Sequence, residues 1–289
     1  MGAGRYKDWS DEPLTEQERR KVGRLLSDPL SLPDAFRGWL ENTIEEMMLN
    51  GSEIPVGVSG GSYSAAVLAD GPALYWKMDD PFVASPATNF LDYSGHGRDS
   101  NSDYSTTTAF QQDGPPIAPA PSYSFQQTGG GTGIGLEAMD AGLQATDNFT
   151  CEIWVYPLAF GIGLPPFIVQ CGASTGWNLT TTLGGANDHF AFGKSGFDVS
   201  IIADSAFSLN TWYHVVVVNR SGTTVMYING VAQSLTANVI YTVPSGSVRI
   251  GPATNVNQDM RLDGKFAHLA IYQTALSAAR IAAHYEARL

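Results

Sequence analysis

The chain has 289 residues, with 16 lysines and arginines against 28 aspartates and glutamates, which gives a formal net charge of −12. This balance excludes electrostatic attraction to nucleic acid or to an anionic membrane, because neither a basic run nor a basic helix face is present. No stretch approaches the apolar length that spans a bilayer, and residues 1–9 lack the apolar core of a secretory signal. We therefore expect neither a transmembrane segment nor a signal peptide.

Charge divides the chain into a head and a body. Residues 1–55, the head, hold 18 of the 44 charged residues. Residues 56–289, the body, are poor in charge and rich in glycine, serine and threonine. Such a body is typical of a β-rich domain. We predict a helical docking segment at residues 1–53, a Gly/Ser/Pro linker at residues 54–69 and a mainly β domain at residues 70–289.

The docking segment is predicted to form two short amphipathic helices. Thr15 and Glu18 have the spacing of a capping box, and a second helix begins near Pro33 and ends at Asn50-Gly51. Its apolar stripe supplies the residues that we expect to dock on a partner, namely Phe36, Trp39, Leu40 and Met47. Helices this short need another surface, which is either a partner or the chain's own β domain. The flexible linker favours a partner.

From residue 73 onward, β-rich runs separated by turn residues predict twelve strands and two long loops, at 81–121 and 128–135. We expect strands at Leu74–Met78, Ser122–Phe125, Phe149–Tyr156, Phe167–Gln170, Trp177–Thr182, His189–Gly193, Val199–Ala203, Thr211–Asn219, Thr223–Ile228, Val231–Ser234, Ser247–Ile250 and Gly264–Ile271. Twelve strands with short turns indicate a two-sheet antiparallel jelly-roll sandwich. Ser277 is predicted to cap a final helix whose Ile281, Tyr285 and Leu289 lie on the sandwich.

The stretch from Asn210 to Val231 is the predicted centre of this fold. Val215 to Val218 are apolar on both faces of their strand, which indicates a central strand covered on both sides. Asn229-Gly230 is a strong hairpin signal that starts a further strand.

Four segments in order carry a family resemblance. They are residues 73–78 with residues 91–99 and their Asp-x-Ser-Gly-x-Gly loop, residues 149–157, residues 210–231 with their Thr-Trp-Tyr-His-Val and Tyr-x-Asn-Gly patterns, and residues 264–285. Together they resemble the laminin-G-like domains of the concanavalin A-like lectin and glucanase superfamily. The resemblance covers roughly residues 70–289 and implies a jelly roll.

Catalysis is not expected. Glucanases of this superfamily need two carboxylates about 5 Å apart, but Glu152 has no acidic partner two or four residues further on. His214, on the central strand, is interpreted as a hydrogen-bonded structural residue. Cys151 and Cys171 are interpreted as small buried hydrophobic residues.

Calcium is the one cofactor that the resemblance implies, because laminin-G-like domains often hold this ion at the rim. Asp92 occupies the matching loop, and Asp99 and Asp103 are nearby oxygen donors. The chain departs from many relatives at Ala267-His268, where they have an Asp-Glu pair.

Sugar binding would require exposed aromatic rings and amide or carboxylate groups beside them. We expect these from Tyr93, Tyr104, Trp177 and Asn187, which lie in or near predicted loops.

This organisation resembles that of bacteriophage structural proteins such as fibre, decoration or host-binding proteins. It implies a non-enzymatic protein on the outer surface of a virion, held by its N-terminal helices to other virion proteins, oligomeric, and presenting a jelly roll to a host-surface glycan. A purely structural coat protein without a ligand, and a secreted carbohydrate-binding module or glycosidase-like enzyme, remain as alternatives.

Overall fold

The protein is represented by a computed structural model. It describes residues 63–80, 90–100, 108–118, 122–127, 134–136, 141–144, 147–160, 165–172, 175–183, 188–194, 198–239, 241, 243–251 and 262–289. The predicted docking residues Phe36, Trp39, Leu40 and Met47 lie outside these ranges, as do the two predicted N-terminal helices.

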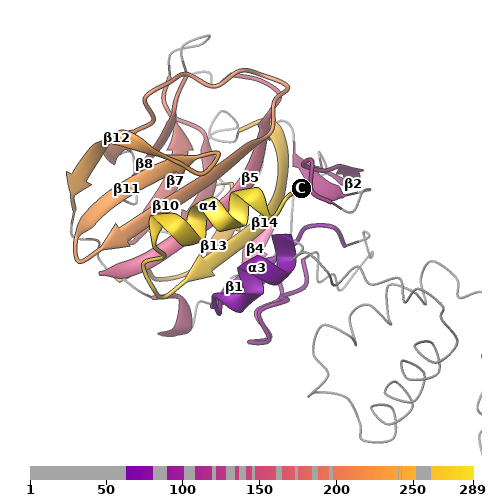
Figure 1. Cartoon of the computed structure of the whole chain (residues 1–289), viewed down its shortest axis with the longest axis horizontal. Coiled ribbons are helices and arrows are strands. Elements are labelled where there is room, and N and C mark those ends of the chain that lie inside the picture. Colours follow the sequence, from indigo (N-terminus) through magenta and orange to yellow (C-terminus); the bar gives the residue numbers. More distant parts are fainter. Residues whose placement is uncertain are drawn as a thin grey trace, which may run out of the picture. The chain divides into compact units, whose positions relative to one another are not determined.

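Eight strands form one antiparallel sheet. Its order is β12 (Val231–Asn238), β11 (Thr223–Ile228), β10 (Tyr213–Arg220), β5 (Asn148–Pro157), β14 (Gly264–Tyr272), β3 (Tyr123–Gln127) and β2 (Thr108–Asp113), and β1 (Leu74–Trp76) also pairs with β14. The long strands β10, β5 and β14 are its centre, because β5 is paired along most of its length on both sides. Both helices with described residues lie on one face of this sheet (Figure 1).

The second antiparallel sheet has six strands. Its order is β4 (Ile134–Leu136), β13 (Val248–Ile250), β6 (Phe167–Cys171), β7 (Trp177–Thr181), β8 (Phe190–Lys194) and β9 (Asp198–Ile202), and a short 3-10 turn, η2, covers Ala141–Leu143. Side chains from both sheets form one buried cluster between them. The predicted two-sheet jelly-roll sandwich is therefore confirmed.

All twelve predicted strands are present, with ends that differ by a few residues. Two strands were missed, because β2 and β4 lie in stretches predicted as loops. Both lie at sheet edges, where each pairs with a single neighbouring strand. That pairing fixes their extended backbone, so the sequence needs no alternating apolar pattern that could have predicted them.

Strand β10 is covered on both faces, as its valines predicted. Val215 and Val217 belong to the cluster between the sheets, whereas Val216 and Val218 belong to a second cluster beneath the helices. All four side chains are buried. This strand therefore separates an inner core from an outer layer.

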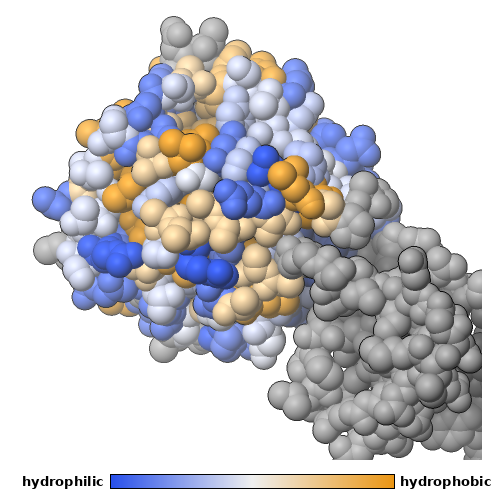
Figure 2. All heavy atoms as spheres, viewed as in Figure 1, coloured by the Kyte–Doolittle hydropathy of each residue, from blue (hydrophilic) through white to orange (hydrophobic). Residues whose placement is uncertain are grey.

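The outer layer is formed by α3 (Tyr63–Ala69) and α4 (Ala278–Glu286). The linker prediction for residues 54–69 was wrong over α3, whose Tyr63 and Val67 are fully buried one helical turn apart. Around α4, hydrophilic and weakly apolar residues are mixed on the surface (Figure 2). Among the described residues, no helix is long and apolar enough to span a bilayer.

Helix α4 begins as predicted. The Ser277 side chain accepts a hydrogen bond from the backbone N–H of Arg280, which caps the helix. Ile281 is fully buried, and Tyr285 stacks on Trp154. The placement of Leu289 on the sandwich was wrong, because this residue follows the end of the helix and is 84 % exposed.

The two cysteines are free thiols inside the sandwich. Burial raises the pKa of both thiols well above the ordinary value. Their predicted role as small buried hydrophobic residues is confirmed.

Candidate functional site

The Asp92 loop is held together by its own carboxylate. Oδ1 of Asp92 accepts hydrogen bonds from the backbone N–H groups of Tyr75 and Ser94, at 3.0 and 2.9 Å. Oδ2 accepts from the Ser94 hydroxyl and the Arg98 N–H, at 2.8 and 2.9 Å. Asp99 in turn accepts from the N–H of Asp92, at 2.7 Å. Both aspartates therefore stabilise the loop and tie it to β1.

Calcium at this loop stays a prediction. A calcium ion would have to share the Asp92 oxygens with three donors of the loop and one of β1. The third predicted ligand, Asp103, lies outside the described residues, and within those ranges no group of three acidic, histidine or cysteine side chains is placed to hold a metal ion.

Of the predicted sugar-binding residues, the two that the structure describes lie apart, since Tyr93 packs on the cluster beneath the helices and Trp177 belongs to the cluster between the sheets. Tyr93 is half-buried: Lys77 Nζ lies 4.1 Å from its ring centroid, and its hydroxyl donates to Asp80. The expectation that Trp177 is exposed was wrong, since it is 1 % exposed and stacks on Phe149 between the sheets. Tyr104 and Asn187 lie outside the described residues.

Glu152 lies on β5 and faces the helices, where it is fully buried in a polar cluster. The Tyr63 hydroxyl donates to its Oε1 at 2.6 Å, and the Tyr272 hydroxyl donates to its Oε2 at 3.2 Å. His214 Nε2 lies 2.8 Å from Oε1, and His284 Nδ1 lies 2.9 Å from Oε2. Strands β5, β10 and β14 and both helices therefore meet at one carboxylate.

Charges in this cluster are balanced by a chain of contacts. His284 Nε2 lies 2.9 Å from Asp70 Oδ2, an ion-pair distance outside hydrogen-bond alignment, and Arg280 Nε donates to the same aspartate at 2.8 Å. An imidazolium at His284 therefore lies between two carboxylates, and the cluster pairs Glu152 and Asp70 with His284 and Arg280. Asp70 directly follows α3 and the two cations belong to α4, so the Asp70 pairs join the two helices, and the His284–Glu152 pair joins α4 to the sheet.

The pKa values in the cluster follow from this geometry. Burial alone would raise the pKa of Glu152, but hydrogen bonds and charge from His214 and His284 outweigh burial and hold it well below its ordinary value. Burial alone would lower the pKa of His284, but the Glu152 hydrogen bond and the charges of Glu152 and Asp70 raise it. His214 is fully buried and hydrogen-bonded, so its predicted structural role is confirmed.

His268 occupies a bulge of β14, at the position where the resemblance expects an acidic pair. Its backbone has φ of 55°, a left-handed conformation that is uncommon outside glycine. Its Nδ1 lies 2.8 Å from the Tyr75 hydroxyl. Burial, with the nearby Lys77 charge, lowers its pKa to about 3, so this imidazole is neutral.

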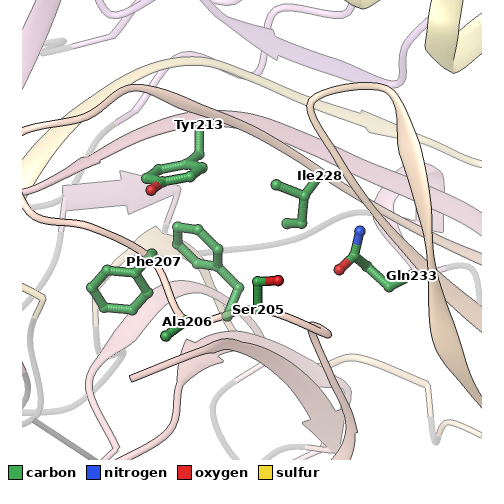
Figure 3. A pocket seen from close by; sticks show the side chains of 7 residues that line it. Ser205, Ala206, Phe207, Tyr213, Ile228 and Gln233 are labelled. Atoms are coloured by element: carbon green, nitrogen blue, oxygen red, sulfur yellow. The ribbon is translucent and has the colours of Figure 1, made fainter. Parts of the chain in front are cut away.

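A cavity of about 160 Å³ lies between the loop at residues 205–207 and strands of both sheets (Figure 3). It is lined by Phe190, Ser205, Ala206, Phe207, Tyr213, Ile228 and Gln233. Tyr213 and Ile228 face residues 205–207 across the space, and the Gln233 amide points in from β12. Both sheets and the loop between β9 and β10 contribute to its wall.

That loop is fixed at several points. The N–H of Phe207 donates to the Asp188 carbonyl at 2.9 Å, and the N–H of Ser208 donates to the Tyr213 hydroxyl at 2.8 Å. Asp204 accepts from the N–H and hydroxyl of Ser234, while its own N–H donates to Gln233 Oε1. The cavity wall is therefore formed before any ligand arrives.

The lining combines aromatic and aliphatic surface with neutral polar groups. Phe190 packs against Phe207 and Tyr213, with ring centroids 4.9 and 5.3 Å apart. Ser205 is exposed at the wall, and Gln233 supplies an amide. None of the lining side chains carries a charge.

Residues 128–282, more than half of the chain, match the sequence profile of the laminin-G-like family described as the concanavalin A-like lectin/glucanases superfamily. The chain belongs to this superfamily. No curated protein matches it in sequence. The resemblance inferred from four segments is therefore confirmed at the level of family and fold.

Solved structures repeat this superfamily's fold at low identity. The ligand binding domain of botulinum neurotoxin serotype D, in complex with N-acetylneuraminic acid, is 15 % identical with a TM-score of 0.55, over 78 % of this chain and 52 % of the domain. The binding domain of Paraclostridial Mosquitocidal Protein 1 is 14 % identical with a TM-score of 0.54, over 75 % and 52 %.

An enzyme is also among the similar structures. Trypanosoma rangeli sialidase in complex with sialic acid is 13 % identical with a TM-score of 0.52, over 74 % of this chain and 32 % of the sialidase. The chain thus spans about half the length of the toxin domains and about a third of the sialidase. At these identities the likeness shows the fold alone.

The cavity residues of this superfamily member were missed in the sequence. Tyr213 and His214 are neighbours in the Trp-Tyr-His motif, and strand alternation sends His214 to the helix side and Tyr213 to the opposite side. That alternation could have located Tyr213. Ser205 and Phe207 lie in a loop whose course depends on hydrogen bonds to β8, β10 and β12, which no local pattern reveals.

Proposed function

We propose that the jelly roll binds a host-surface glycan and that the chain is a non-enzymatic structural protein of a bacteriophage virion. The observation that carries the binding proposal is the preformed cavity, where apolar walls meet neutral hydrogen-bonding groups at the protein surface. Sugar sites combine these two kinds of contact. Membership of a lectin and glucanase superfamily supports the same ligand class, although a fold hosts many functions.

Two of the similar solved structures add support for a glycan. The neurotoxin ligand binding domain is described in complex with N-acetylneuraminic acid and the sialidase in complex with sialic acid. Both ligands are sugars.

A binding role without catalysis is proposed because of where Glu152 lies. Retaining glycoside hydrolysis requires two carboxylates about 5 Å apart beside the substrate. Glu152 is fully buried and in contact with four side chains that belong to this chain. The Glu152 carboxylate instead forms the hydrogen bonds that join both helices to the sheet.

Attachment to a virion is proposed from the organisation of the chain. Residues 1–53, with their predicted helices, would anchor it to other virion proteins, and residues that precede α3 would tether the jelly roll outward. Many tethered copies would add weak glycan contacts through avidity. The proposal places the chain on the outer surface of the particle as an oligomer.

The test is binding of the full chain to an immobilised panel of bacterial surface polysaccharides. We expect saturable binding to a subset, and at least about tenfold weaker binding after Ser205→Trp, which fills the cavity. Thr236→Trp is the matched control, because it adds the same side chain at an exposed position on β12 outside the lining. Circular dichroism confirms that each variant is folded.

Each outcome of this experiment decides something. Failure to bind any polysaccharide contradicts the glycan proposal and favours a coat protein without a ligand. Binding that survives Ser205→Trp places the ligand elsewhere. Release of reducing sugar from a bound polysaccharide would contradict the non-enzymatic assignment.

Calcium at the Asp92 loop is a separate proposal that rests on the resemblance. If calcium binds the folded chain, added Ca²⁺ raises the Tm and a chelator lowers it. The same comparison on Asp99→Asn tests whether the shift belongs to this loop. An unchanged Tm in the wild type would contradict the proposal.

A further inference from the structure

We infer that the cavity takes a single uncharged sugar ring, a terminal hexose or N-acetylhexosamine, and discriminates against acidic sugars. This inference rests on the proposed function and specifies its ligand class. It also sets the chain apart from the sialic acid complexes among its structural neighbours.

Size limits the occupant to one ring. The cavity volume of about 160 Å³ is close to that of engineered cavities of about 150 Å³, which hold a benzene-sized molecule. Pockets for larger ligands have volumes of about 300–1,000 Å³. An oligosaccharide would therefore place its terminal residue inside and leave the remainder in solvent.

Charge selects against an acidic ring. The lining contains no lysine or arginine that could pair with a sugar carboxylate, and a carboxylate desolvated without a partner is costly. The nearest described acid in sequence, Asp204, directly precedes Ser205 and is fixed at the wall by Ser234. Its negative charge, in a chain with a net charge of −12, further repels an anion.

Three neutral groups can recognise hydroxyls or an acetamido group. The Ser205 hydroxyl is exposed at the wall. The Tyr213 hydroxyl accepts from the N–H of Ser208, which leaves its own proton for a ligand. Gln233 uses one amide proton on the Val231 carbonyl and keeps a second.

Apolar surface completes the match to a pyranose. Ile228 lies beside Tyr213 on one wall, and Phe207 belongs with Ser205 to the facing wall, so a ring between them would meet an apolar side chain and a hydroxyl on each side (Figure 3). The fixed loop lowers the ordering cost of binding, which matters for a ligand this small.

The test uses the full chain and albumin conjugates that carry a terminal hexose, a terminal N-acetylhexosamine, or the same glycans capped with N-acetylneuraminic acid. We expect binding to at least one uncapped conjugate and at least about tenfold weaker binding to its sialylated form. Ser205→Trp should abolish the binding, and Thr236→Trp should leave it unchanged.

A competition measurement tests the single-ring limit without any variant. The free methyl glycoside of the terminal sugar should compete about as well as a longer oligosaccharide with the same end, within about threefold. An oligosaccharide that competes about a hundredfold better overturns the single-ring assignment.

The remaining outcomes separate this inference from the proposed function. Preference for the sialylated conjugates overturns the inference and leaves glycan binding intact. Binding of bacterial polysaccharides that neither neutral sugar inhibits also overturns the inference alone. Absence of binding to every conjugate and every polysaccharide overturns both.

Discussion

The charged carboxylate of Glu152 is buried away from water, so neighbouring side chains must supply the hydrogen bonds that water would otherwise donate. Two tyrosine hydroxyls and two imidazoles surround its carboxylate, and Asp70 and Arg280 complete the balance. Such a group is costly to leave unpaired. It therefore fixes the positions of α3 and α4 more specifically than apolar contacts alone.

Glu152→Gln should destabilise the protein strongly. The substitution removes the negative charge and leaves the buried His284 imidazolium with Asp70 as its remaining carboxylate, so the loss should lie toward the lower end of the about 3–5 kcal/mol that breaking a buried pair costs. Urea denaturation of the full chain measures the loss as a lower midpoint at unchanged m. Glu286→Gln removes the same charge at an exposed position of α4 and should change stability by less than about 0.5 kcal/mol. Equal effects would contradict the buried ion-pair account.

Protonation of His268 should make the free energy of unfolding depend on pH. Its folded pKa of about 3 lies below the ordinary value of about 6.5, so the unfolded chain takes up a proton first and stability falls as pH decreases between these values. The slope is about 1.4 kcal/mol per pH unit. His268→Asn keeps a residue that tolerates the left-handed backbone and removes this titration. Urea midpoints from about pH 7 to pH 4 should fall less steeply in this variant; parallel curves would contradict the assignment.

Residue roles were predictable from sequence only in part. The structural role of His214 followed from its place on an apolar central strand. Its partner cluster did not, because Tyr63, Tyr272 and His284 are 89, 120 and 132 residues from Glu152 along the chain. Contacts over such separations are created by the fold and leave no local spacing to read.

At the scale of elements, β12 is the exposed edge strand of the larger sheet, and Asp204 protects it. Residues 233–235 lie at an irregularity in the pairing of β12 with β11, and the Asp204 carboxylate accepts from the N–H and hydroxyl of Ser234 there. These bonds lower the pKa of Asp204. A capped bulge of this kind makes an edge strand harder to extend with another chain.

Asp204→Ala should loosen this edge and the cavity wall together. The N–H of Ser234 loses its acceptor, so its hydrogen exchange should become faster, whereas the amide of Val217 in the centre of the sheet should keep its protection. Residues 205–207 should also exchange faster, and binding of the neutral sugar conjugate should weaken. Unchanged exchange at Ser234 would show that the carboxylate does not protect this edge.

Elements were more predictable where a pattern continues over many residues. The valine run of β10 and the hairpin signal at Asn229-Gly230 predicted β10 to β12, and Ser277 predicted the start of α4. Helix α3 was missed because its seven residues follow a glycine- and serine-rich stretch, and its helical state depends on burying Tyr63 and Val67 against the sheet.

At the scale of the whole molecule, the described fold contains its own core. Both hydrophobic clusters are built from described residues between Tyr63 and Ile281, and the ion pairs that hold the helices lie between Asp70 and His284. Stability and attachment are therefore separable in principle. The jelly roll would supply the binding site, and residues 1–53 would set how many copies act together.

Deletion of residues 1–57 should therefore preserve the fold and remove the avidity. We expect the fragment 58–289 to unfold at nearly the same Tm as the full chain, because it keeps every described residue of both clusters. Size-exclusion chromatography with light scattering should show a monomer for the fragment and, as we propose, an oligomer for the full chain. Its binding to a dense polysaccharide surface should fall about 10²–10⁴-fold, while its affinity for a free monosaccharide stays unchanged. A fragment that keeps the oligomeric state would place the assembly contacts on the jelly roll, and one that fails to fold would make residues 1–57 part of its core.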